Sequence, residues 1–572
     1  MYDLVIRNGT VVDGTGLPSY AADVAVTGDR IAAIGRIRER GKEEIDATGQ
    51  VVTPGFIDGH THMDAQVFWD PIGSCSCWHG VTSVVMGNCG FTLAPGAPEQ
   101  RDMILSNLIR AEDISADAMD AAIKWSWTSF REYLGVVDKL PKAINYAAQV
   151  GHSAIRTHVM GKRAFEQKVN VTSDDLGAME HELLDALDAG AIGFSSSLST
   201  AHKLPEPDSR PVASFNASWD EVTRLVCAMG STGRGVFEYA REREARSPDP
   251  AVRKAVNDRL RDLAVKSGVP ITFGLPSGST GTQDALKLLD DTAAAGGRMF
   301  GQTHTRGISH MLSFKGRLQF DDFPEWAELR SLPFEQQRKA FSEPESRKRL
   351  VEATKRGGYR TGGGEPRAPQ YHNMYVFKDA VGRNATVAEL AAQRGVDPVE
   401  VMMDLALESN FEQLFMQFDE ATVAKSEDEA LTTLKHPRTV MTFSDSGAHV
   451  SLIMDSSIHT HLLAYWMRER GAFTLEEAVK MITLTPAVAW GFVDRGLVRQ
   501  GCIADLNVFD PTTIAPQMPT IEHDLPTGAR RLKQKSSGIA ATIIAGKVAF
   551  RNGEHTGALG GKLLRSTANG VL

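Results

Sequence analysis

Eight short apolar runs, separated by stretches with helical periodicity, constrain the fold of this chain more than any other feature of its sequence. The helix-patterned "TQDALKLLDDTAAAGG", for example, is followed one residue later by the apolar run "MFGQTH". Alternating strand and helix patterns are typical of a parallel sheet, and eight such units predict an α/β protein built on a (β/α)8 barrel of the TIM type. The eight strands are expected at residues 55–62, 81–89, 144–152, 190–197, 234–239, 269–274, 298–304 and 438–445.

The two ends of the 572-residue chain carry a different pattern from its middle. Stretches such as "YDLVIRNGTVVDG" and "IAATIIAGKVAFRNG" alternate apolar and polar residues between turns rich in Gly, Asn and Asp, which is typical of half-buried strands. We therefore expect residues 1–54 and 491–572 to form one small β-sandwich with a C-terminal tail, beside a barrel formed by residues 55–490. The barrel is expected to hold a helical insertion at about 305–437, with a mobile Gly/Pro-rich stretch, "YRTGGGEPRAPQ", that could serve as a lid.

Composition and charge exclude several classes of protein. The chain has 62 Lys and Arg against 71 Asp and Glu, a net charge of −9, and no basic tract, which argues against a nucleic-acid partner. Five cysteines in so long a chain do not form a disulfide framework and indicate a reducing compartment. The N-terminal "MYDLVIRNGT" lacks the apolar core of a signal peptide, and no stretch approaches the roughly eighteen apolar residues of a membrane span. These features predict a soluble cytoplasmic protein that does not bind membranes, and a homo-oligomer is compatible with them.

Several of the expected strands end in side chains that bind metal ions. The first run closes with two histidines in "GFIDGHTHMD", and residues two apart on a strand face the same way. In a TIM-type barrel the active site is built at the carboxyl ends of the strands. His, Cys, Asp and Glu side chains gathered there are suited to an open divalent-metal site. His60 and His62, together with Asp445 at the end of the eighth strand, form the expected metal-binding set, and Glu238 lies near the end of the fifth strand. Cys89 ends the second strand and, taken alone, is expected to be a small buried apolar residue.

Three other side chains near strand ends are expected to contact a substrate. His152 follows the third strand, and His304 and Arg306 follow the seventh. Either histidine could donate a hydrogen bond to an oxyanion. Arg306 is the expected partner of a substrate carboxylate, because the guanidinium fork matches that shape. A structural ion pair is the alternative for Arg306.

The motifs resemble a known family. The runs "VVTPGFIDGHTHMDAQ", "GVTSVVMGNCGFTLAP" and "TFSDSGAH" are similar to those of the amidohydrolase superfamily, specifically its N-acyl-D-amino-acid deacylase (D-aminoacylase-like) branch. The similarity covers nearly the whole chain, from "DLVIRNGTVVDGTG" to "GKVAFRNGEHTG". It implies a (β/α)8 barrel flanked by a small β-sandwich from both chain ends. It also implies a zinc-dependent hydrolase that cleaves the C–N bond of a small-molecule amide, above all of an N-acyl amino acid.

The resemblance further implies roles for individual residues. His60 and His62 would bind the more buried metal ion, and Cys89 would take the place of the metal-bridging lysine carbamate of many superfamily members. Asp445 would be both a metal ligand and the general base. The deacylase branch has a histidine at the ends of strands five and six, whereas this chain has "GVFEYA" and "PITFGLP" there. One tightly held zinc ion per chain is therefore expected rather than two, with Glu238 standing in at strand five.

Two alternatives to a deacylase stay open at this point. A cyclic amide or imide hydrolase, or a deaminase, would use the same barrel and metal, because function lies in the pocket and not in the fold. A non-catalytic barrel scaffold would have no use for His60, His62 and Asp445, but the histidines absent from strands five and six keep this alternative open.

Overall fold

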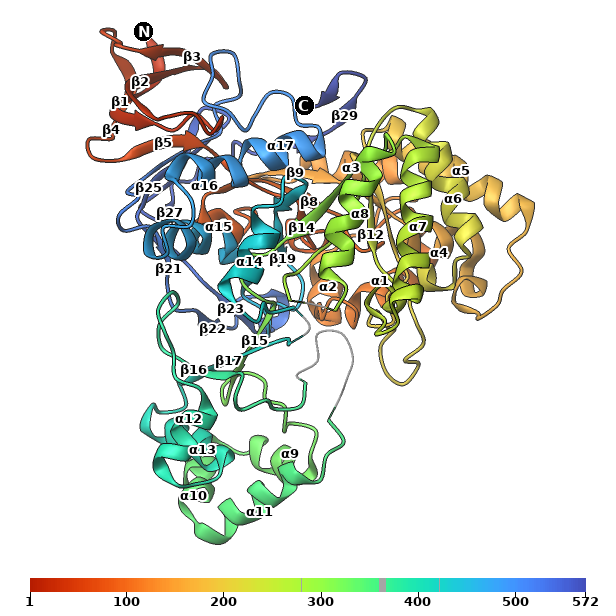
Figure 1. Ribbon diagram of the computed structural model, residues 1–572, viewed down its shortest axis with the longest axis vertical. Coiled ribbons are helices and arrows are strands. Elements are labelled where there is room, and N and C mark those ends of the chain that lie inside the picture. The colour runs from red at the N-terminus through yellow and green to blue at the C-terminus, as the bar shows by residue number, and fades with distance from the viewer. Residues whose placement is uncertain (279, 360–366, 421) are drawn as a thin grey trace.

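A ring of eight parallel strands forms the centre of the computed structural model, which describes residues 1–278, 280–359, 367–420 and 422–572 (Figure 1). Each strand pairs with the next in parallel register. The eighth returns to the first, with Phe443 opposite His60, so the ring is closed. Several strands are interrupted, and the segments are β6 (Phe56–Asp58), β7 (His60–Thr61), β8 (Val81–Met86), β9 (Asn145–Ala148), β10 (Val150–Gly151), β11 (Gly193–Ser197), β12 (Val236–Ala240), β13 (Ile271–Gly274), β14 (Met299–Thr303), β18 (Thr439–Met441) and β19 (Phe443–Ser446). The predicted (β/α)8 barrel is confirmed.

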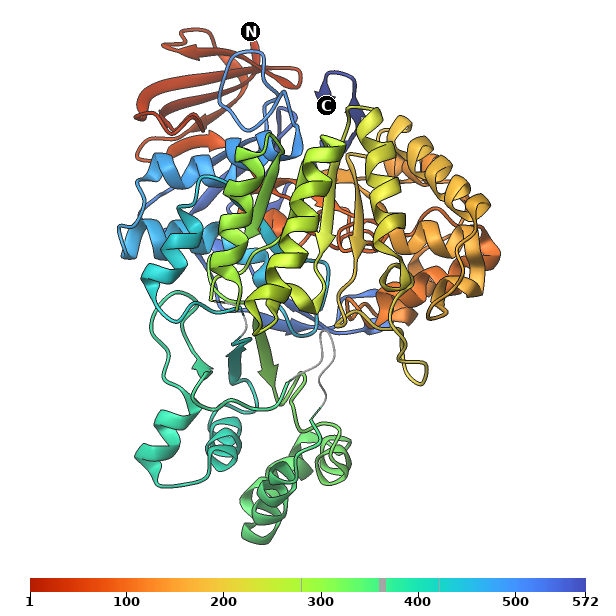
Figure 2. The ribbon, with the colours of Figure 1, turned by 45° about the vertical axis from the view of Figure 1, so that its right-hand side comes forward.

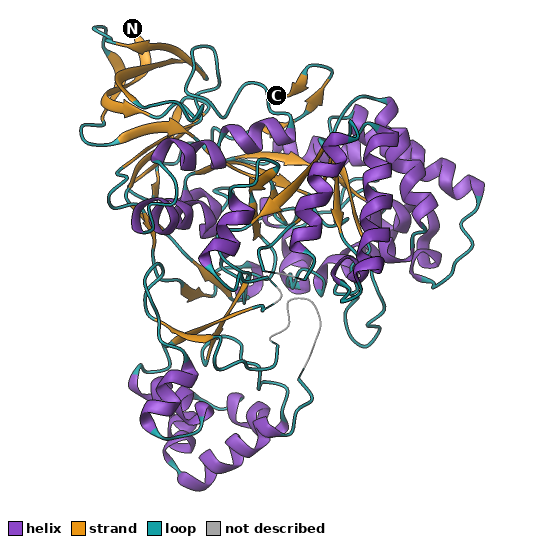
Figure 3. Ribbon diagram, in the orientation of Figure 1, coloured by secondary structure: helices purple, strands orange, loops and turns teal. Residues whose placement is uncertain are grey.

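Helices cover the outside of this ring, as Figures 2 and 3 show. Many begin at a side chain that caps the free backbone N–H groups of the first turn, for example Ser129 with Glu132 and Thr474 with Glu477. Each such cap stabilises a helix by about 1 kcal/mol. None of the helices in the described part of the chain is long and apolar enough to cross a bilayer. The covering helices include α3 (Phe130–Lys139), α5 (Ser173–Asp188), α6 (Trp219–Ser231), α7 (Pro250–Ser267), α8 (Thr282–Ala294), α14 (Glu427–Leu434) and α16 (Leu475–Ile482).

Strands from both chain ends form one nine-stranded sheet beside the barrel, at the upper left of Figure 1. The two ends meet where Val52 pairs with Val508 in antiparallel register. The sheet branches at its first strand, which pairs with three others and lets the sheet enclose its own apolar core. The predicted β domain from both chain ends is thus confirmed. Its strands are β1 (Tyr2–Val11), β2 (Tyr20–Thr27), β3 (Arg30–Gly35), β4 (Gly41–Asp46), β5 (Val51–Pro54), β20 (Leu506–Phe509), β25 (Ile539–Ile544), β26 (Lys547–Arg551) and β27 (Glu554–His555).

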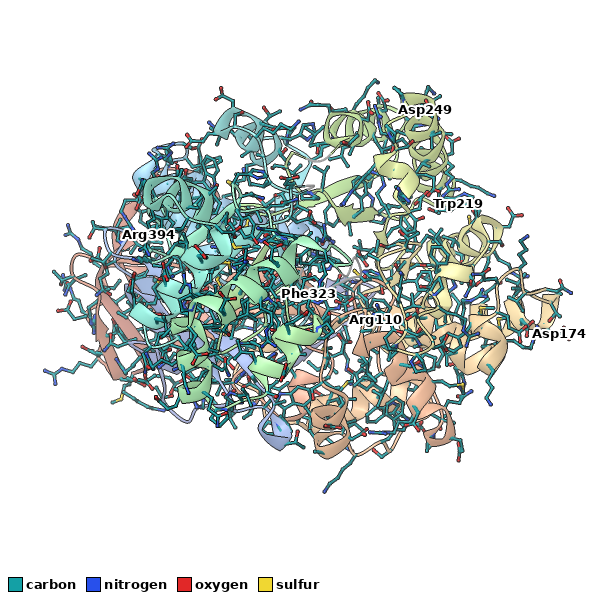
Figure 4. The ribbon with its side chains drawn as sticks, turned by 90° about the horizontal axis from the view of Figure 1, so that it is seen from below. Arg110, Asp174, Trp219, Asp249, Phe323 and Arg394 are labelled. Carbon is teal, nitrogen blue, oxygen red and sulfur yellow. The ribbon has the colours of Figure 1, made fainter. Side chains whose placement is uncertain are left out.

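The expected insertion forms a separate lobe at the opposite end of the molecule from this sheet (Figure 1). It has its own core, in which the rings of Phe314 and Phe341 meet edge to face at 5.2 Å. Figure 4, seen from below, marks this lobe by Phe323 and Arg394 and the helical side of the barrel by Asp174 and Trp219. Besides the expected helices it contains a three-stranded antiparallel sheet. Its elements are β15 (Ser309–Ser313), α9 (Pro324–Arg330), α10 (Phe334–Ser342), α11 (Pro344–Lys355), β16 (Met374–Phe377), α12 (Val387–Arg394), α13 (Pro398–Glu408) and β17 (Leu414–Phe418).

The Gly/Pro-rich stretch that was expected to be a mobile lid includes residues 360–366, which lie outside the described residues.

Candidate metal centre

All five side chains predicted to bind metal line one cavity at the carboxyl ends of the barrel strands. The cavity measures about 240 Å³ and is bounded by strand ends of the barrel and by Ile308, Asp419 and Thr422 at the base of the insertion. The structure therefore brings together residues that are hundreds of positions apart in the sequence. The five are His60, His62, Cys89, Glu238 and Asp445.

Four of these side chains form a tight cluster. Ligand atoms of His60, His62 and Cys89 all lie within 4.8 Å of one another. The Oδ1 atom of Asp445 is 3.1 Å from Nε2 of His62 and 3.5 Å from Nε2 of His60. The Sγ atom of Cys89 is 3.7 Å from Nε2 of His60. Two imidazoles, a thiol and a carboxylate are the donor types that zinc prefers.

Neighbouring groups hold this cluster in place. The Nδ1 atom of His60 lies 2.6 Å from Oε1 of Gln302. Because an amide oxygen only accepts hydrogen bonds, Nδ1 must carry the hydrogen, which leaves the Nε2 lone pair free to bind a metal. Gly447 follows Asp445 with φ of +94°, and a Cβ atom there would lie 2.6 Å from the carbonyl oxygen of His62. Only glycine allows the two segments to approach so closely.

The charges of the cluster depend on one another. Burial raises the pKa of Asp445, but the hydrogen bond from His62 and the positive charge of His62 outweigh it, so the net pKa is well below its usual range. Burial lowers the pKa of His62, but the carboxylates of Glu112 and Asp445 outweigh it and raise the pKa to about 9. Burial lowers the pKa of His60 to about 3. Without a metal ion, His62 therefore carries a proton at neutral pH, in the place where a cation would bind.

Two loop residues that the sequence did not suggest lie beside this cluster. Glu112 lies in the turn between α1 (Arg101–Ile109) and α2 (Ala116–Ala122), with Oε2 at 3.5 Å from Nε2 of His62. His202 follows β11, and its ligand atom lies within 4.8 Å of those of Cys89 and Glu112. His449, one turn after Asp445, is near the same oxygen, with Nε2 at 3.7 Å from Oε2 of Glu112.

Glu238 is in the cavity but does not join the four-residue cluster. Its Oε2 atom accepts a hydrogen bond from the backbone N–H of Cys89 at 2.6 Å. Its Oε1 atom is buried and, like Oε1 of Glu112, has no hydrogen-bond partner among the described residues. Burial raises the pKa of Glu238 to about 8. Unpaired carboxylate oxygens in a buried site fit a place where a cation or a substrate donor binds.

The structure corrects the predicted substrate contact of His152. The side chain is fully buried at the start of α4 (His152–Met160), away from the cavity. Its Nδ1 and Nε2 atoms lie 2.8 Å from Ser196 Oγ and Glu221 Oε1, respectively. Both ring nitrogens are therefore engaged in packing α4 against β11 and α6.

His304 and Arg306 also lie away from the metal cavity. They line a second cavity of about 650 Å³ between the barrel and the insertion. Arg306 Nη2 donates to Oδ1 of Asp455 at 2.9 Å, and His304 Nε2 lies 3.4 Å from Oδ2 of the same carboxylate. For Arg306 the structure thus favours the structural ion pair over the substrate contact. Three other arginines line the metal cavity instead, namely Arg241, Arg246 and Arg367.

Comparison with known proteins agrees with the fold and the motifs. The profile described as the amidohydrolase family matches residues 43–550. An uncharacterised protein of Mycobacterium tuberculosis is 27% identical over 597 residues, which cover 97% of this chain and 93% of that protein. A D-aminoacylase of Alcaligenes xylosoxydans xylosoxydans is 26% identical over 579 residues, which cover 99% and 98% of the two chains.

A solved structure has the same fold. It is that of N-acyl-D-glutamate deacylase from Bordetella bronchiseptica, complexed with zinc and a phosphonate inhibitor, and it is 23% identical with a TM-score of 0.64 over 99% of both chains. The barrel, the β domain from both chain ends and a profile match over most of the sequence confirm the resemblance that the motifs suggested. The chain belongs to the amidohydrolase family.

Proposed function

We propose that this protein is a zinc-dependent deacylase that hydrolyses N-acyl amino acids, with the D series, named in its relatives, as the first candidates. The observation that carries the proposal is the four-residue metal cluster at the floor of a cavity that also holds guanidinium groups. A zinc ion held by these side chains would activate water for attack on an amide carbonyl. A guanidinium group is suited to bind the carboxylate of an amino acid. The five cysteines are all unpaired, which supports the reducing cytoplasm as the place of action.

The residues proposed to hold the zinc ion are those of the cluster. A bound zinc ion would polarise the amide carbonyl and lower the pKa of a water molecule. One tightly held ion per chain is proposed, because strands five and six bring no histidine to the cavity. Its ligands would be His60, His62, Cys89 and Asp445.

Asp445 is the proposed general base. Its lowered pKa keeps the carboxylate ionised at neutral pH, so it can accept a proton as the attacking water adds to the amide carbon. The same proton then passes to the amide nitrogen as the C–N bond breaks, which gives a carboxylic acid and a free amine, and the acid proton then moves to the amine. His202 replaces His152 and His304 as the proposed donor to the carbonyl oxygen. Its Nδ1 atom lies 2.7 Å from Ser197 Oγ, which leaves Nε2 for the substrate.

Arg241 replaces Arg306 as the proposed partner of the substrate carboxylate. It follows β12 directly, and its guanidinium lies over the ring of Phe273 at 4.6 Å from the ring centroid. Burial lowers its pKa to about 10, so it stays cationic at neutral pH. The Nε atom has no hydrogen-bond partner among the described residues. A preorganised cation with a free N–H is suited to bind a carboxylate.

The test is a panel of N-acyl-D- and N-acyl-L-amino acids, with cyclic imides alongside, offered to zinc-loaded protein and to His62→Ala. We expect hydrolysis of N-acyl amino acids by the parent and none by the variant. Hydrolysis of the cyclic imides alone would contradict the proposal and would favour a cyclic amidohydrolase. Absence of turnover on every substrate would favour a non-catalytic barrel.

A further inference from the structure

Three arginines line the metal cavity, and two of them form no ion pair with a described residue. Of its three arginines, Arg367 is paired with Asp419, with Nη1 at 2.7 Å from Oδ1. Arg241 and Arg246 are different: among the described residues, neither has a carboxylate oxygen within the 4.0 Å of an ion pair. Arg241 and Arg246 thus line one cavity without a direct ion pair to a described carboxylate, and the negative charge of Asp419 acts on Arg246 only from a longer distance.

The position of Arg241 explains why its charge faces the cavity. One guanidinium nitrogen is held by the side-chain oxygen of Asn257, and the plane rests on Phe273. The adjacent carboxylate of Glu242 is engaged by Arg259 and by the hydroxyl of Tyr239. The carboxylate that follows Arg241 in the sequence is therefore already bound by other side chains, and the Arg241 guanidinium remains available to a ligand.

Arg246 presents the second unpaired charge. It ends the short helical turn η6 (Arg243–Arg246) that follows β12, and its side chain is exposed to solvent within the cavity wall. Burial is the main cause that lowers the pKa of Arg241, and the positive charge of Arg246 lowers it further. Like charges that share a cavity repel each other, and a ligand with two anionic groups would remove that repulsion.

We infer that the substrate of this cavity carries two carboxylates, one bound by Arg241 and the other by Arg246. This inference rests on the proposed deacylase function and narrows its substrate class. The second carboxylate belongs either to an acidic amino-acid side chain or to a dicarboxylic acyl group such as succinyl. Apolar wall residues, among them Leu275 and Phe443, are left to contact the uncharged part of the molecule.

The test compares N-acetyl-glutamate, N-succinyl-leucine and N-acetyl-methionine, each as the D- and the L-enantiomer. Turnover is measured with the zinc-loaded parent protein, and binding is measured by calorimetry with Asp445→Asn, which should not consume the ligand. Because Arg246 would form a charge-assisted hydrogen bond with the second carboxylate, we expect at least one dianion to bind roughly 10- to 100-fold more tightly than N-acetyl-methionine. Arg246→Gln should abolish that preference and leave the affinity for N-acetyl-methionine within about 2-fold.

Arg243→Gln is the matched control, because Arg243 lies on the same helical turn but does not line the cavity. It should leave the preference intact. A preference for N-acetyl-glutamate alone places the second carboxylate on the side chain, and one for N-succinyl-leucine alone places it on the acyl group; both support the inference. Equal binding of mono- and dianions, or an effect of Arg246→Gln on both alike, would overturn it. Preferential binding of a dianion without hydrolysis would uphold the inference and contradict the deacylase proposal instead.

Discussion

Replacement of Asp445 by asparagine separates proton transfer from metal binding. The Oδ1 atom of Asp445 lies 3.1 Å from His62 and 3.5 Å from His60, so an asparagine oxygen in the same place can still act as a ligand. The amide has no basic site that could accept the proton of the attacking water. Asp445 has φ of +59°, a left-handed conformation that asparagine adopts as readily as aspartate. The substitution should therefore leave the backbone unstrained.

The expected loss of turnover follows from the role of a general base. Such a group contributes about 10²- to 10⁴-fold to the rate, which corresponds to about 2.7–5.4 kcal/mol of activation free energy at 1.36 kcal/mol per tenfold. Zinc content should change less, because His60, His62 and Cys89 remain. The substitution removes one negative charge from the metal site. A neutral oxygen ligand attracts a cation less strongly, so the affinity for zinc should fall moderately.

The assay measures kcat on an N-acyl amino acid that the parent hydrolyses, together with zinc per chain and the melting temperature. A kcat lowered by at least about 100-fold with zinc retained agrees with the assignment. Near-normal turnover of Asp445→Asn would refute it, and other titratable groups of the cavity, among them Glu112, Glu238, His202 and His449, would become the candidate bases.

Three further outcomes follow from the same cluster. His62→Ala should lose zinc and activity together, as metal analysis after dialysis and a turnover assay will show; a variant that keeps its zinc would remove His62 from the ligand set. Gln302→Leu takes away the acceptor that orients His60 and should weaken zinc binding by about 10- to 100-fold in a chelator competition, whereas unchanged affinity would mean that Gln302 does not orient the ligand. The pKa of His62 is raised from 6.5 to about 9 in the metal-free fold. Protonation of His62 therefore stabilises that fold fully below pH 6.5, and this stabilisation is lost as the pH rises through 9. Because zinc must displace this proton, the gain in melting temperature on adding zinc should be larger at about pH 8 than at about pH 6; an equal or opposite trend would contradict the raised pKa.

The parts of this fold that follow local periodicity could be predicted from the sequence. Apolar runs such as "TSVVM" have no polar alternation, because strands of a parallel barrel are buried on both faces. The proposed ligands His60, Cys89 and Asp445 come where those runs end. A strand end fixes the position of a side chain to within a residue or two. Those residues could therefore be placed at the mouth of one barrel before any coordinates were known.

Residues carried by loops could not be placed in this way. Glu112 and His202 reach the cavity through turns whose path depends on tertiary packing, and no periodicity marks them. His304 and Arg306 do follow the seventh strand, but both pair with the carboxylate of Asp455 and line a second cavity. His152 likewise follows a strand and is engaged by Glu221 from the covering helix α6. In each case the partner lies more than 60 residues away in the sequence, so the strand end alone did not reveal which way the side chain would be used.

Removal and return of zinc test the central claim most directly. The protein is stripped with a chelator, dialysed, and reloaded with increasing zinc, while zinc per chain and hydrolysis of N-acyl-D-amino acids are followed in parallel. The cluster of His60, His62, Cys89 and Asp445 predicts that activity is lost with the metal and is restored in full at about one tightly held zinc per chain. Undiminished hydrolysis by the metal-free protein, or two zinc ions retained per chain after exhaustive dialysis, would contradict the account.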